Sequence, residues 1–388
     1  MAQKIKVLLI MGPIIRGGAE LQVYEIARHL ERASFEPIIC SASYKLSLGL
    51  NNELSNRSAQ DLDLYRRFVE LGVKVYELDP YPVYDPRGVR AIVQIIRREK
   101  IDLIHVNLVI WGQLAGLLTG IATVPHVRSE LAWPDIPRLA YWGNAVTHRW
   151  FKVIIAVSEA VKAQVVHRWG VPSENVQVVH SGIDLERFNP QSRQIVGKLR
   201  QNLGIKPEEE VVIRVANARS AKALDDFVEL AALVCRQRAN TRFVLLGDGA
   251  LLPRLKAQAQ THNLGERLLF LGRRSDVPQL LAMANIFVST SRQEASPGSM
   301  KEAMAMQLPV VATAVGGHPE IVSHGQSGYL TPPGDPQAMA ERVIWLLDHP
   351  AEATLMGHQG RAIVAAKFTN CHMVDGVARA YVTAIGKN

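Results

Sequence analysis

The sequence predicts an α/β protein made of two doubly wound domains, each built around a parallel sheet. The first observation is the length, because 388 residues are more than a single hydrophobic core usually holds. The second is that short apolar, β-branched runs alternate with helical patterns along both halves of the chain. The third is that polar and glycine-containing loops follow several of these runs. In such sheets ligands bind beyond the carboxyl ends of the strands.

The expected strands follow one another at short intervals. In the first half they lie at residues 4–11, 37–42, 73–78, 101–106, 124–128, 153–157 and 176–180. In the second half they lie at residues 211–216, 242–247, 268–271, 286–290, 309–313 and 329–331. Helical patterns stand between them, for example at residues 20–30 and 89–99. The polar stretch 184–201 is the expected linker, which gives domains at residues 1–186 and 187–370 and a C-terminal segment at 371–388.

Composition argues against several classes of protein. Cys40, Cys235 and Cys371 are far apart and show neither disulfide nor metal spacing, so a reducing compartment is the simpler expectation. The formal net charge is +8, but no basic cluster with interleaved aromatics indicates a nucleic-acid surface. An apolar run at residues 7–15 is better explained as part of a first strand than as a signal peptide. The uncharged run 106–124 fits a strand and a buried helix better than a membrane span.

One stretch, residues 291–319, combines acids with free backbone amides. Glu294 and Glu302 stand eight positions apart, with a proline–glycine loop between them and a short helix and strand after them. Carboxylates accept hydrogen bonds from sugar and ribose hydroxyls, and N–H groups at a helix start bind phosphate, so the stretch suits a sugar nucleotide. The alternative for Glu302 is a capping box with Ser299, in which the carboxylate only closes its own helix.

Two further loops carry groups that suit phosphate. Residues 16–20 contain Gly17 and Gly18, which let the backbone approach a ligand just before a helix N-terminus. An ordinary strand–helix turn is the alternative there. A loop in the second half holds Arg219 and Lys222, two cations that can neutralise a diphosphate leaving group without a metal. Solvated surface cations are the alternative for that loop.

These motifs resemble the Glu-x7-Glu signature of retaining glycosyltransferases with the GT-B fold, in particular glycosyltransferase family four. The family typically reads Glu-Gly-Phe-Pro-Asn, then Glu-Ala-Met-Ala, Pro-Val-Val-Ala-Thr and Gly-Gly-x-Pro-Glu. Matches to the signature and to the glycine and proline motifs after it stand at Glu294, Pro297, 302–305, 309–313, 316–320, 325–330 and 333–336. The chain departs from the family at Ala295, Ser296 and Gly298, in the loop whose backbone amides face the donor sugar.

The resemblance covers nearly the whole chain and implies a role for each motif. The two domains would face each other across a cleft, with the acceptor on the first and a nucleoside-diphosphate sugar on the second, and the last helix would cross back onto the first. Glu302 would hold ribose hydroxyls, Glu294 would hold the sugar, and Arg219 and Lys222 would hold the departing diphosphate. The other implied donor contacts are Gly17, Gly18, Asn217, Gly247, Gly249, Arg273, Ser296, Pro297, Gly298, Ser299 and Met300.

The catalytic position of the first domain departs most from the family. Relatives place a histidine six residues after a proline near the end of the fifth strand, and counting from Pro125 gives Leu131 here. Glu130 is the expected substitute, and a structural ion pair between Glu130 and Arg128 is the alternative. His126 is expected to lie within the strand itself.

The expected function is transfer of a sugar from a UDP- or GDP-linked co-substrate to a saccharide, lipid or polysaccharide-precursor hydroxyl. The resemblance implies retained configuration, no metal and no cofactor. The alternatives are an epimerase or hydrolase of the same fold, or a non-catalytic sugar-nucleotide-binding relative. A dinucleotide-dependent oxidoreductase is disfavoured, because no Gly-x-Gly-x-x-Gly follows the first strand.

The expected location is the cytoplasm, with a surface that touches the inner face of the membrane. Residues 133–152 mix aromatic with basic side chains, a combination that is compatible with contact with an anionic membrane or a lipid-linked acceptor. The alternative is a helix whose aromatic face lies in the core.

Overall fold

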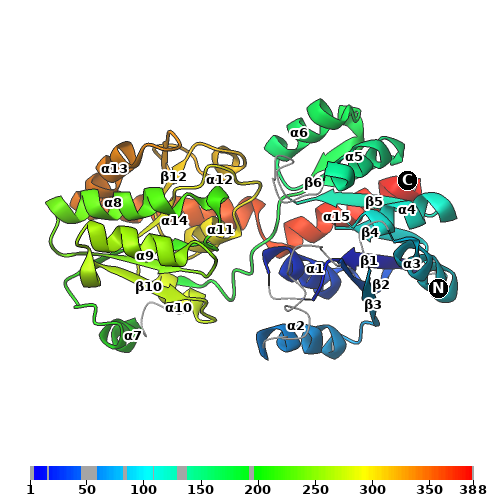
Figure 1. The fold of residues 1–388 in the computed structure, drawn as a ribbon, viewed down its shortest axis with the longest axis horizontal. Helices are drawn as coiled ribbons and strands as arrows, with labels where there is room; N and C mark the ends of the chain where they lie inside the picture. Colours follow the sequence, from blue (N-terminus) through cyan, green and yellow to red (C-terminus); the bar gives the residue numbers. More distant parts are fainter. Residues whose placement is uncertain are drawn as a thin grey trace. The chain divides into compact units, whose positions relative to one another are not determined.

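The computed structural model describes residues 4–14, 17–44, 59–81, 85–107, 109–128, 138–191 and 196–386. The chain forms two compact units (Figure 1): residues 1–182 with 370–388, and residues 183–369. The chain leaves the first unit after Gly182, four residues before the expected boundary, and returns at Asn370. These two points are adjacent, because a Cβ added at Gly182 would lie 2.6 Å from the Cα of Asn370.

The described part of the first unit contains a seven-stranded parallel sheet in the order β3-β2-β1-β4-β5-β6-β7. Its strands are β1 Ile5–Met11, β2 Phe35–Tyr44, β3 Val75–Tyr81, β4 Leu103–Val106, β5 Ala122–Val127, β6 Ile154–Ala156 and β7 Val176–Val178. Its helices are α1 Gly18–His29, α2 Ala59–Glu70, α3 Pro86–Glu99, α4 Ile110–Thr119, α5 Arg138–Thr147, α6 Glu159–Trp169 and α15 Asn370–Ile385, with 3-10 turns η2 His148–Trp150 and η3 Ser173–Asn175.

Helices pack on both faces of this sheet, which explains why its central strands are mostly apolar. Leu9 belongs to the core on one face of β1 and Leu8 to the core on the other. The C-terminal helix α15 enters the first of these cores through Met373, Val377 and Tyr381. The last helix of the chain is therefore part of the first unit.

The described part of the second unit contains a six-stranded parallel sheet in the order β10-β9-β8-β11-β12-β13. Its strands are β8 Glu210–Val215, β9 Thr241–Leu246, β10 Leu268–Gly272, β11 Ile286–Ser289, β12 Val310–Thr313 and β13 Gly328–Thr331. Its helices are α7 Val196–Asn202, α8 Leu224–Gln237, α9 Leu252–Thr261, α10 Val277–Ala282, α11 Gly298–Ala305, α12 His318–Ile321, α13 Pro336–Asp348 and α14 Pro350–Lys367, with 3-10 turns η5 Ser220–Lys222 and η6 Gly265–Arg267. The stretch expected as a linker, 184–201, lies in this unit, where α7 packs against α10.

The fold class predicted from the sequence is confirmed. Every expected strand is present, with ends that shift by three residues at most. The uncharged run 106–124 ends β4, forms α4 and begins β5. Among the described helices, none combines the length and the apolar character that crossing a membrane requires.

Candidate active site

The predicted donor residues lie in loops that leave one edge of the second sheet. Lys222 follows β8, Gly247 follows β9, Arg273 follows β10 and Glu294 follows β11. Parallel strands end at the same edge, so loops that are distant in sequence meet there. The strand order reverses between β8 and β11, which are paired neighbours, and such a reversal is where open α/β sheets bind ligands.

An ion pair between Lys222 and Glu294 stands at this reversal point. The Lys222 Nζ lies 2.5 Å from the Glu294 Oε2, and the side chains are 23% and 13% exposed. Burial raises the pKa of the Glu294 carboxyl, but Lys222, His318 and Arg214 together bring it below its ordinary value. Glu294 is therefore an ionised hydrogen-bond acceptor at neutral pH.

A buried hydrogen-bond chain runs from Glu294 into the sheet. Arg214, on β8 and 1% exposed, donates from Nη2 to the Ser291 Oγ at 2.7 Å. The Ser291 Oγ lies 3.5 Å from the Glu294 Oε2, and Thr313 donates to the Ser291 carbonyl at 2.6 Å. Arg214 belongs to none of the motifs found in the sequence. The signal that could have found it is a single charge within the otherwise apolar run 211–216.

His318, the first residue of α12, fixes the same loop from the β12 side. Its Nδ1 donates to the Thr313 carbonyl at 2.6 Å, which leaves Nε2 as an acceptor 3.4 Å from the Ser289 Oγ. Burial lowers the pKa of His318 to about 4, so the ring is neutral at pH 7. The N–H of Gly317 donates to the Glu294 carbonyl at 2.9 Å, which fixes the main chain of Glu294.

Helix α11 begins at Gly298, and its N-cap is Pro297, without a side-chain cap hydrogen bond. The capping-box alternative for Glu302 is therefore wrong, because Ser299 is the second helical residue rather than the cap. Pro297 already turns the chain into the helix, with φ −73° and ψ 101°. The N–H groups of Gly298 to Met300 consequently belong to the first turn, where a helix offers its donors to an outside acceptor.

Glu302, on the same helix, sits among cations. Burial raises the pKa of its carboxyl, while Arg187 and Lys301 act to lower it. Lys301 is fully buried and donates from Nζ to the Ser296 Oγ at 3.2 Å. Arg187, which the sequence analysis did not single out, lines a pocket of about 380 Å³ together with Ser275, Asp276, Pro278 and Gln279. This pocket lies at the loop after β10, where Arg273 is exposed and Arg274 is paired with Asp276 at 2.6 Å.

Two glycines after β9 let the neighbouring loops come close. Gly247 and Gly249 have φ of +133° and +150°, which other residues rarely adopt. A Cβ at Gly247 would lie 1.9 Å from the Ala216 carbonyl oxygen, and one at Gly249 would lie 2.7 Å from another carbonyl oxygen of the same loop. That loop follows β8 and carries Asn217 and Arg219, both exposed. Glycine is therefore required for the two loops to lie side by side.

The first unit also has a glycine loop at the start of a helix. Gly17 is the N-cap of α1 without a side-chain cap hydrogen bond, and Gly18 is the first helical residue. The Glu20 carboxylate lies over this start, because a Cβ at Gly17 would be 2.3 Å from the Glu20 Oε2. Burial raises the pKa of Glu20, against the effects of its own N–H and of Arg128. Glu130 lies outside the described residues, so its catalytic role and its pairing with Arg128 stay predictions.

His126 lies within β5 and is 1% exposed, as the sequence predicted. Its Nδ1 is 3.1 Å from the His105 Nε2, and the His105 Nδ1 is 2.6 Å from the Tyr381 Oη. The two rings connect β4 and β5 to the C-terminal helix α15. Burial lowers the pKa of His105 to about 3 and that of His126 well below its ordinary value, so this network is neutral and structural.

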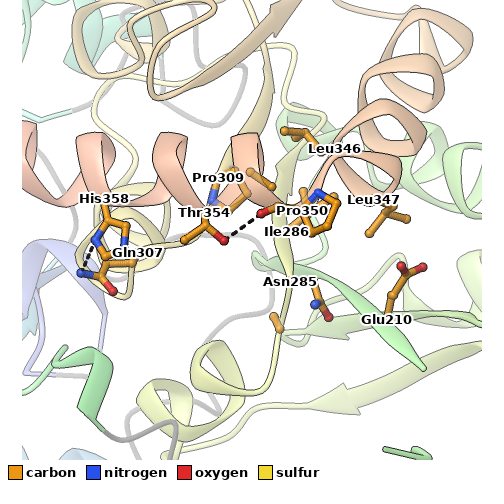
Figure 2. A pocket seen from close by; sticks show the side chains of 12 residues that line it. Glu210, Asn285, Ile286, Gln307, Pro309, Leu346, Leu347, Pro350, Thr354 and His358 are labelled. Carbon is orange, nitrogen blue, oxygen red and sulfur yellow. Dashed lines mark hydrogen bonds between the residues drawn. The ribbon is translucent and has the colours of Figure 1, made fainter. Parts of the chain in front are cut away.

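A separate pocket of about 160 Å³ lies at the opposite edge of the second sheet (Figure 2). Glu210 and Asn285 line it where β8 and β11 begin, and Thr354 and His358 line it from α14. None of the predicted site residues lines this pocket, so it is distinct from the predicted donor site. Within the described ranges, no group of three or more His, Cys, Asp or Glu side chains is arranged to hold a metal ion.

The fold and these loops define a sugar-transferring enzyme of the GT-B class. The model of glycosyl transferases group 1 matches residues 196–363, and the model of glycosyltransferase family 4 matches residues 16–187. The chain belongs to this family of glycosyltransferases, and the family predicted from the Glu-x7-Glu stretch is confirmed.

Curated relatives and a solved structure agree with this assignment. The chain is 27% identical to N-acetyl-alpha-D-glucosaminyl L-malate synthase of Bacillus anthracis, over 79% of this chain and 81% of that protein. It is 24% identical to UDP-Gal:alpha-D-GlcNAc-diphosphoundecaprenol alpha-1,3-galactosyltransferase of Escherichia coli, over 78% of this chain and 81% of that protein. The crystal structure of Anabaena HepE in complex with UDP and glucose superposes with a TM-score of 0.80 at 22% identity, covering 98% of this chain and 100% of that one. HepE thus shares the fold.

Proposed function

We propose that the protein is a retaining, metal-independent glycosyltransferase. It would move a sugar from a nucleoside-diphosphate sugar to a hydroxyl of a saccharide, lipid or polysaccharide precursor. The observation that carries the proposal is the Lys222–Glu294 pair, with Nζ and Oε2 2.5 Å apart where the strand order of the second sheet reverses. A carboxylate that suits sugar hydroxyls and a cation that suits a phosphate stand side by side there.

In the proposed reaction each group of this edge has one task. Glu302 accepts hydrogen bonds from the ribose hydroxyls, and Glu294 accepts them from the donor sugar, next to the amides of residues 296–300. The bond from the anomeric carbon to the diphosphate breaks while the acceptor hydroxyl attacks from the same face. The diphosphate takes the hydroxyl proton. Lys222 and Arg219 neutralise the charge that develops on the diphosphate, which is the task a metal ion performs in other enzymes.

UDP is the nucleotide that we favour for the donor, with GDP as the second choice. UDP is bound in the HepE structure, and the E. coli relative is named for a UDP-linked galactose. The donor would act as a co-substrate, and no further cofactor is proposed. The acceptor side would draw on the first unit, where Gly17, Gly18 and Glu20 gather at the start of α1.

Nucleotide binding by calorimetry tests the donor site. We would titrate UDP, GDP, ADP and NAD into the wild type, into Glu302→Gln, and into a control, Glu341→Gln, which alters an exposed acid on α13. We expect one nucleoside diphosphate to bind, and Glu302→Gln to weaken it by about tenfold or more, because a hydrogen bond to a charged acceptor is lost. If only NAD binds, or if both variants bind like the wild type, the site assignment fails.

Turnover separates transfer from the related activities. With the matching nucleotide sugar and a set of hydroxyl acceptors, we expect acceptor-dependent release of the nucleotide that persists in excess chelator. Release of free sugar at a rate that does not depend on the acceptor would indicate a hydrolase. A nucleotide sugar whose sugar is epimerised while it stays bound to the nucleotide would indicate an epimerase. Binding without turnover of any donor would indicate a non-catalytic relative.

We also propose that the first unit touches the cytoplasmic face of a membrane. Trp150 is 64% exposed on η2, Val146 52% on α5, and Leu118 74% on α4, a helix that packs against α5. Lys152, two residues after Trp150, is also exposed. Apolar side chains beside a cation suit anionic lipid. We expect Trp150→Ser to reduce sedimentation with phosphatidylglycerol vesicles, and Leu355→Ser, at a 59% exposed position of the second unit, to leave it unchanged. Equal sedimentation with phosphatidylcholine vesicles would count against the proposal.

A further inference from the structure

The pocket at the opposite edge of the second sheet takes no part in the proposed reaction. Its volume is about 160 Å³. Its floor is apolar and buried, and it consists of Ile286 at the start of β11, Pro309 just before β12, and Leu346 and Leu347 near the end of α13. A six-membered carbon ring fills a closed apolar cavity of about 150 Å³. The pocket therefore has room for a single ring of about that size.

Polar side chains border this apolar floor on two sides. Figure 2 shows Gln307 and His358 on one side of the pocket and Glu210 and Asn285 on the other. Ligand sites commonly have this layout, in which an apolar surface carries a few polar groups that fix the orientation of the ligand.

Two of the polar groups are hydrogen-bond donors. The Gln307 Nε2 donates to the His358 Nδ1 at 3.0 Å, so the ring proton of His358 stands on Nε2, which has no partner among the described residues. The Asn285 Oδ1 accepts from the N–H of Val211 at 2.8 Å, which leaves the Asn285 Nδ2 as a donor.

Glu210 and Thr354 supply acceptors. The Arg238 Nη2 donates to the Glu210 Oε1 at 3.0 Å, and that oxygen can accept a further hydrogen bond. The Thr354 hydroxyl donates to the Pro350 carbonyl at 2.8 Å and keeps its lone pairs. Arg238 also pairs with Asp348, so its one positive charge faces two negative ones. This negative balance disfavours an anionic ligand.

Gln307 has a backbone conformation that favours glycine. Its φ is +59°, directly after the C-cap of α11, where helices commonly end in glycine. Its carbonyl oxygen faces Gly357 of α14, where an added Cβ would lie 2.1 Å from it. This close approach fixes the wall of the pocket, but the turn itself gives no reason for a glutamine side chain. An amide that borders the pocket and orients His358 accounts for it.

We propose that this pocket binds a single sugar unit, a neutral ring whose hydroxyls meet the polar groups while its carbons cover the apolar floor. A hydroxyl both donates and accepts, so it suits a pocket that offers donors and acceptors. An apolar ring would bury the Asn285 amide and the His358 N–H without partners, which costs binding energy. Nucleic-acid bases commonly stack on aromatic side chains, and no Phe, Tyr or Trp is among the described residues that line the pocket.

Methyl NMR spectroscopy of the full chain tests the inference without a donor. The methyl groups of Ile286, Leu346 and Leu347 report on the floor of the pocket, and that of Met300 reports on the start of α11. The probes are the methyl glycosides of glucose, galactose, mannose and N-acetylglucosamine, and inorganic phosphate, uracil and benzene represent the competing classes of ligand. We expect at least one glycoside to shift the floor methyls saturably in the millimolar range.

Three results of this titration would overturn the inference. The first is that no glycoside shifts the floor methyls. The second is that phosphate, uracil or benzene shifts them and the glycosides do not. The third is a glycoside-dependent shift of Met300 without any shift of the floor methyls, because it would place the sugar at the predicted donor loop.

A first pair of variants fills the pocket. Ala353→Leu adds a larger side chain to the wall that α14 forms, and it should abolish the glycoside-dependent shifts of the floor methyls. Ala351→Leu makes the same exchange at an exposed position of the same helix and should bind the glycoside like the wild type.

A second pair keeps the test decisive if Ala353→Leu does not fold. Gln307→Gly suits the backbone and removes the amide, so it should weaken glycoside binding by about two- to tenfold. Asn263→Gly makes the matching exchange at another position of positive φ, +54°, and should bind like the wild type. Equal affinities for Ala353→Leu and Ala351→Leu, or for the second pair where Ala353→Leu does not fold, would overturn the inference.

The inference does not rest on the proposed function, because its residues belong to a pocket distinct from the predicted donor site. A protein that binds no nucleoside diphosphate but binds a glycoside here would refute the proposed function alone. A protein that turns over a nucleotide sugar but shows no glycoside-dependent shift of the floor methyls would refute this inference alone.

Discussion

Acid should unfold the first unit well before carboxylates are protonated, because this unit buries neutral histidines. Burial lowers the pKa of His105 from 6.5 to about 3 and that of His148 to about 4, and it lowers that of His126 in the same direction. A group whose pKa is lower in the folded state contributes full stability above its unfolded pKa. That stability is lost as the pH falls from 6.5 toward the folded values. At pH 5 the loss is about 2 kcal/mol for each of His105 and His148, and His126 adds to it. A typical domain is stable by about 5–15 kcal/mol, so the effect is large.

The assay is urea unfolding followed by circular dichroism and tryptophan fluorescence between pH 8 and pH 4.5. His148→Gln tests the reasoning, because Gln can still donate to the Asn144 carbonyl that the His148 Nδ1 contacts at 2.6 Å. We expect this variant to reduce the slope of stability against pH by about 1.4 kcal/mol per pH unit below pH 6. The exposed His167, substituted by Gln, is the control and should leave the slope unchanged. Equal slopes for the two variants, or a wild-type stability that is flat from pH 7 to pH 5, would refute the argument.

Two further predictions concern single contacts. Gly247→Ala should destabilise the second unit by about 2–4 kcal/mol, because its φ is +133° and the new Cβ would lie 1.9 Å from the Ala216 carbonyl oxygen. Gly334→Ala is the control, because its φ is +75° but the space around the new Cβ is open, and it should lower the free energy of unfolding by only about 1–2 kcal/mol. Both values would be measured by urea unfolding, and equal losses for the two variants would contradict the steric reason. Tyr381→Phe removes the hydroxyl 2.6 Å from the His105 Nδ1 and should lower the free energy of unfolding of the first unit by about 1–3 kcal/mol. Hydrogen exchange of the α15 amides measures this loss, and exchange as slow as in the wild type would show that the contact contributes nothing.

Much of the fold could be predicted from the sequence because its signals are local. Residues 7–11 and 286–289 lie in strands that are buried on both faces of their sheets. Such burial requires apolar side chains at consecutive positions, and that composition is what identified the strands in the sequence. The loop that holds Arg219 and Lys222 was found for a similar reason, since it follows a strand and precedes a helix. Its proximity to Glu294 follows from the reversal of strand order, which is a property of the whole sheet.

The remaining features depend on contacts that no local pattern encodes. Arg214 reaches Ser291 across 77 positions of sequence, and a single charge in a strand does not indicate its partner. The capping-box alternative for Glu302 failed because Pro297 is the N-cap of α11 and Gly298 its first residue, so Ser299 falls inside the first turn. The pair of His105 and Tyr381 joins residues 276 positions apart, which only the return of the chain into the first unit makes adjacent.

The charges at the edge of the second sheet suit the proposed binding of a diphosphate beside the acidic Glu294. Glu294 carries one negative charge and faces two cations, Lys222 and Arg214, while Arg219 is exposed on the adjoining loop. When one of the two cations pairs with Glu294, the other cation and Arg219 leave net positive charge at the reversal point. The backbone N–H groups at the start of α11 add to it. The two cations differ in burial, since Arg214 is 1% exposed and the Lys222 side chain 23%, so Lys222 is the one of the two that an incoming anion can reach.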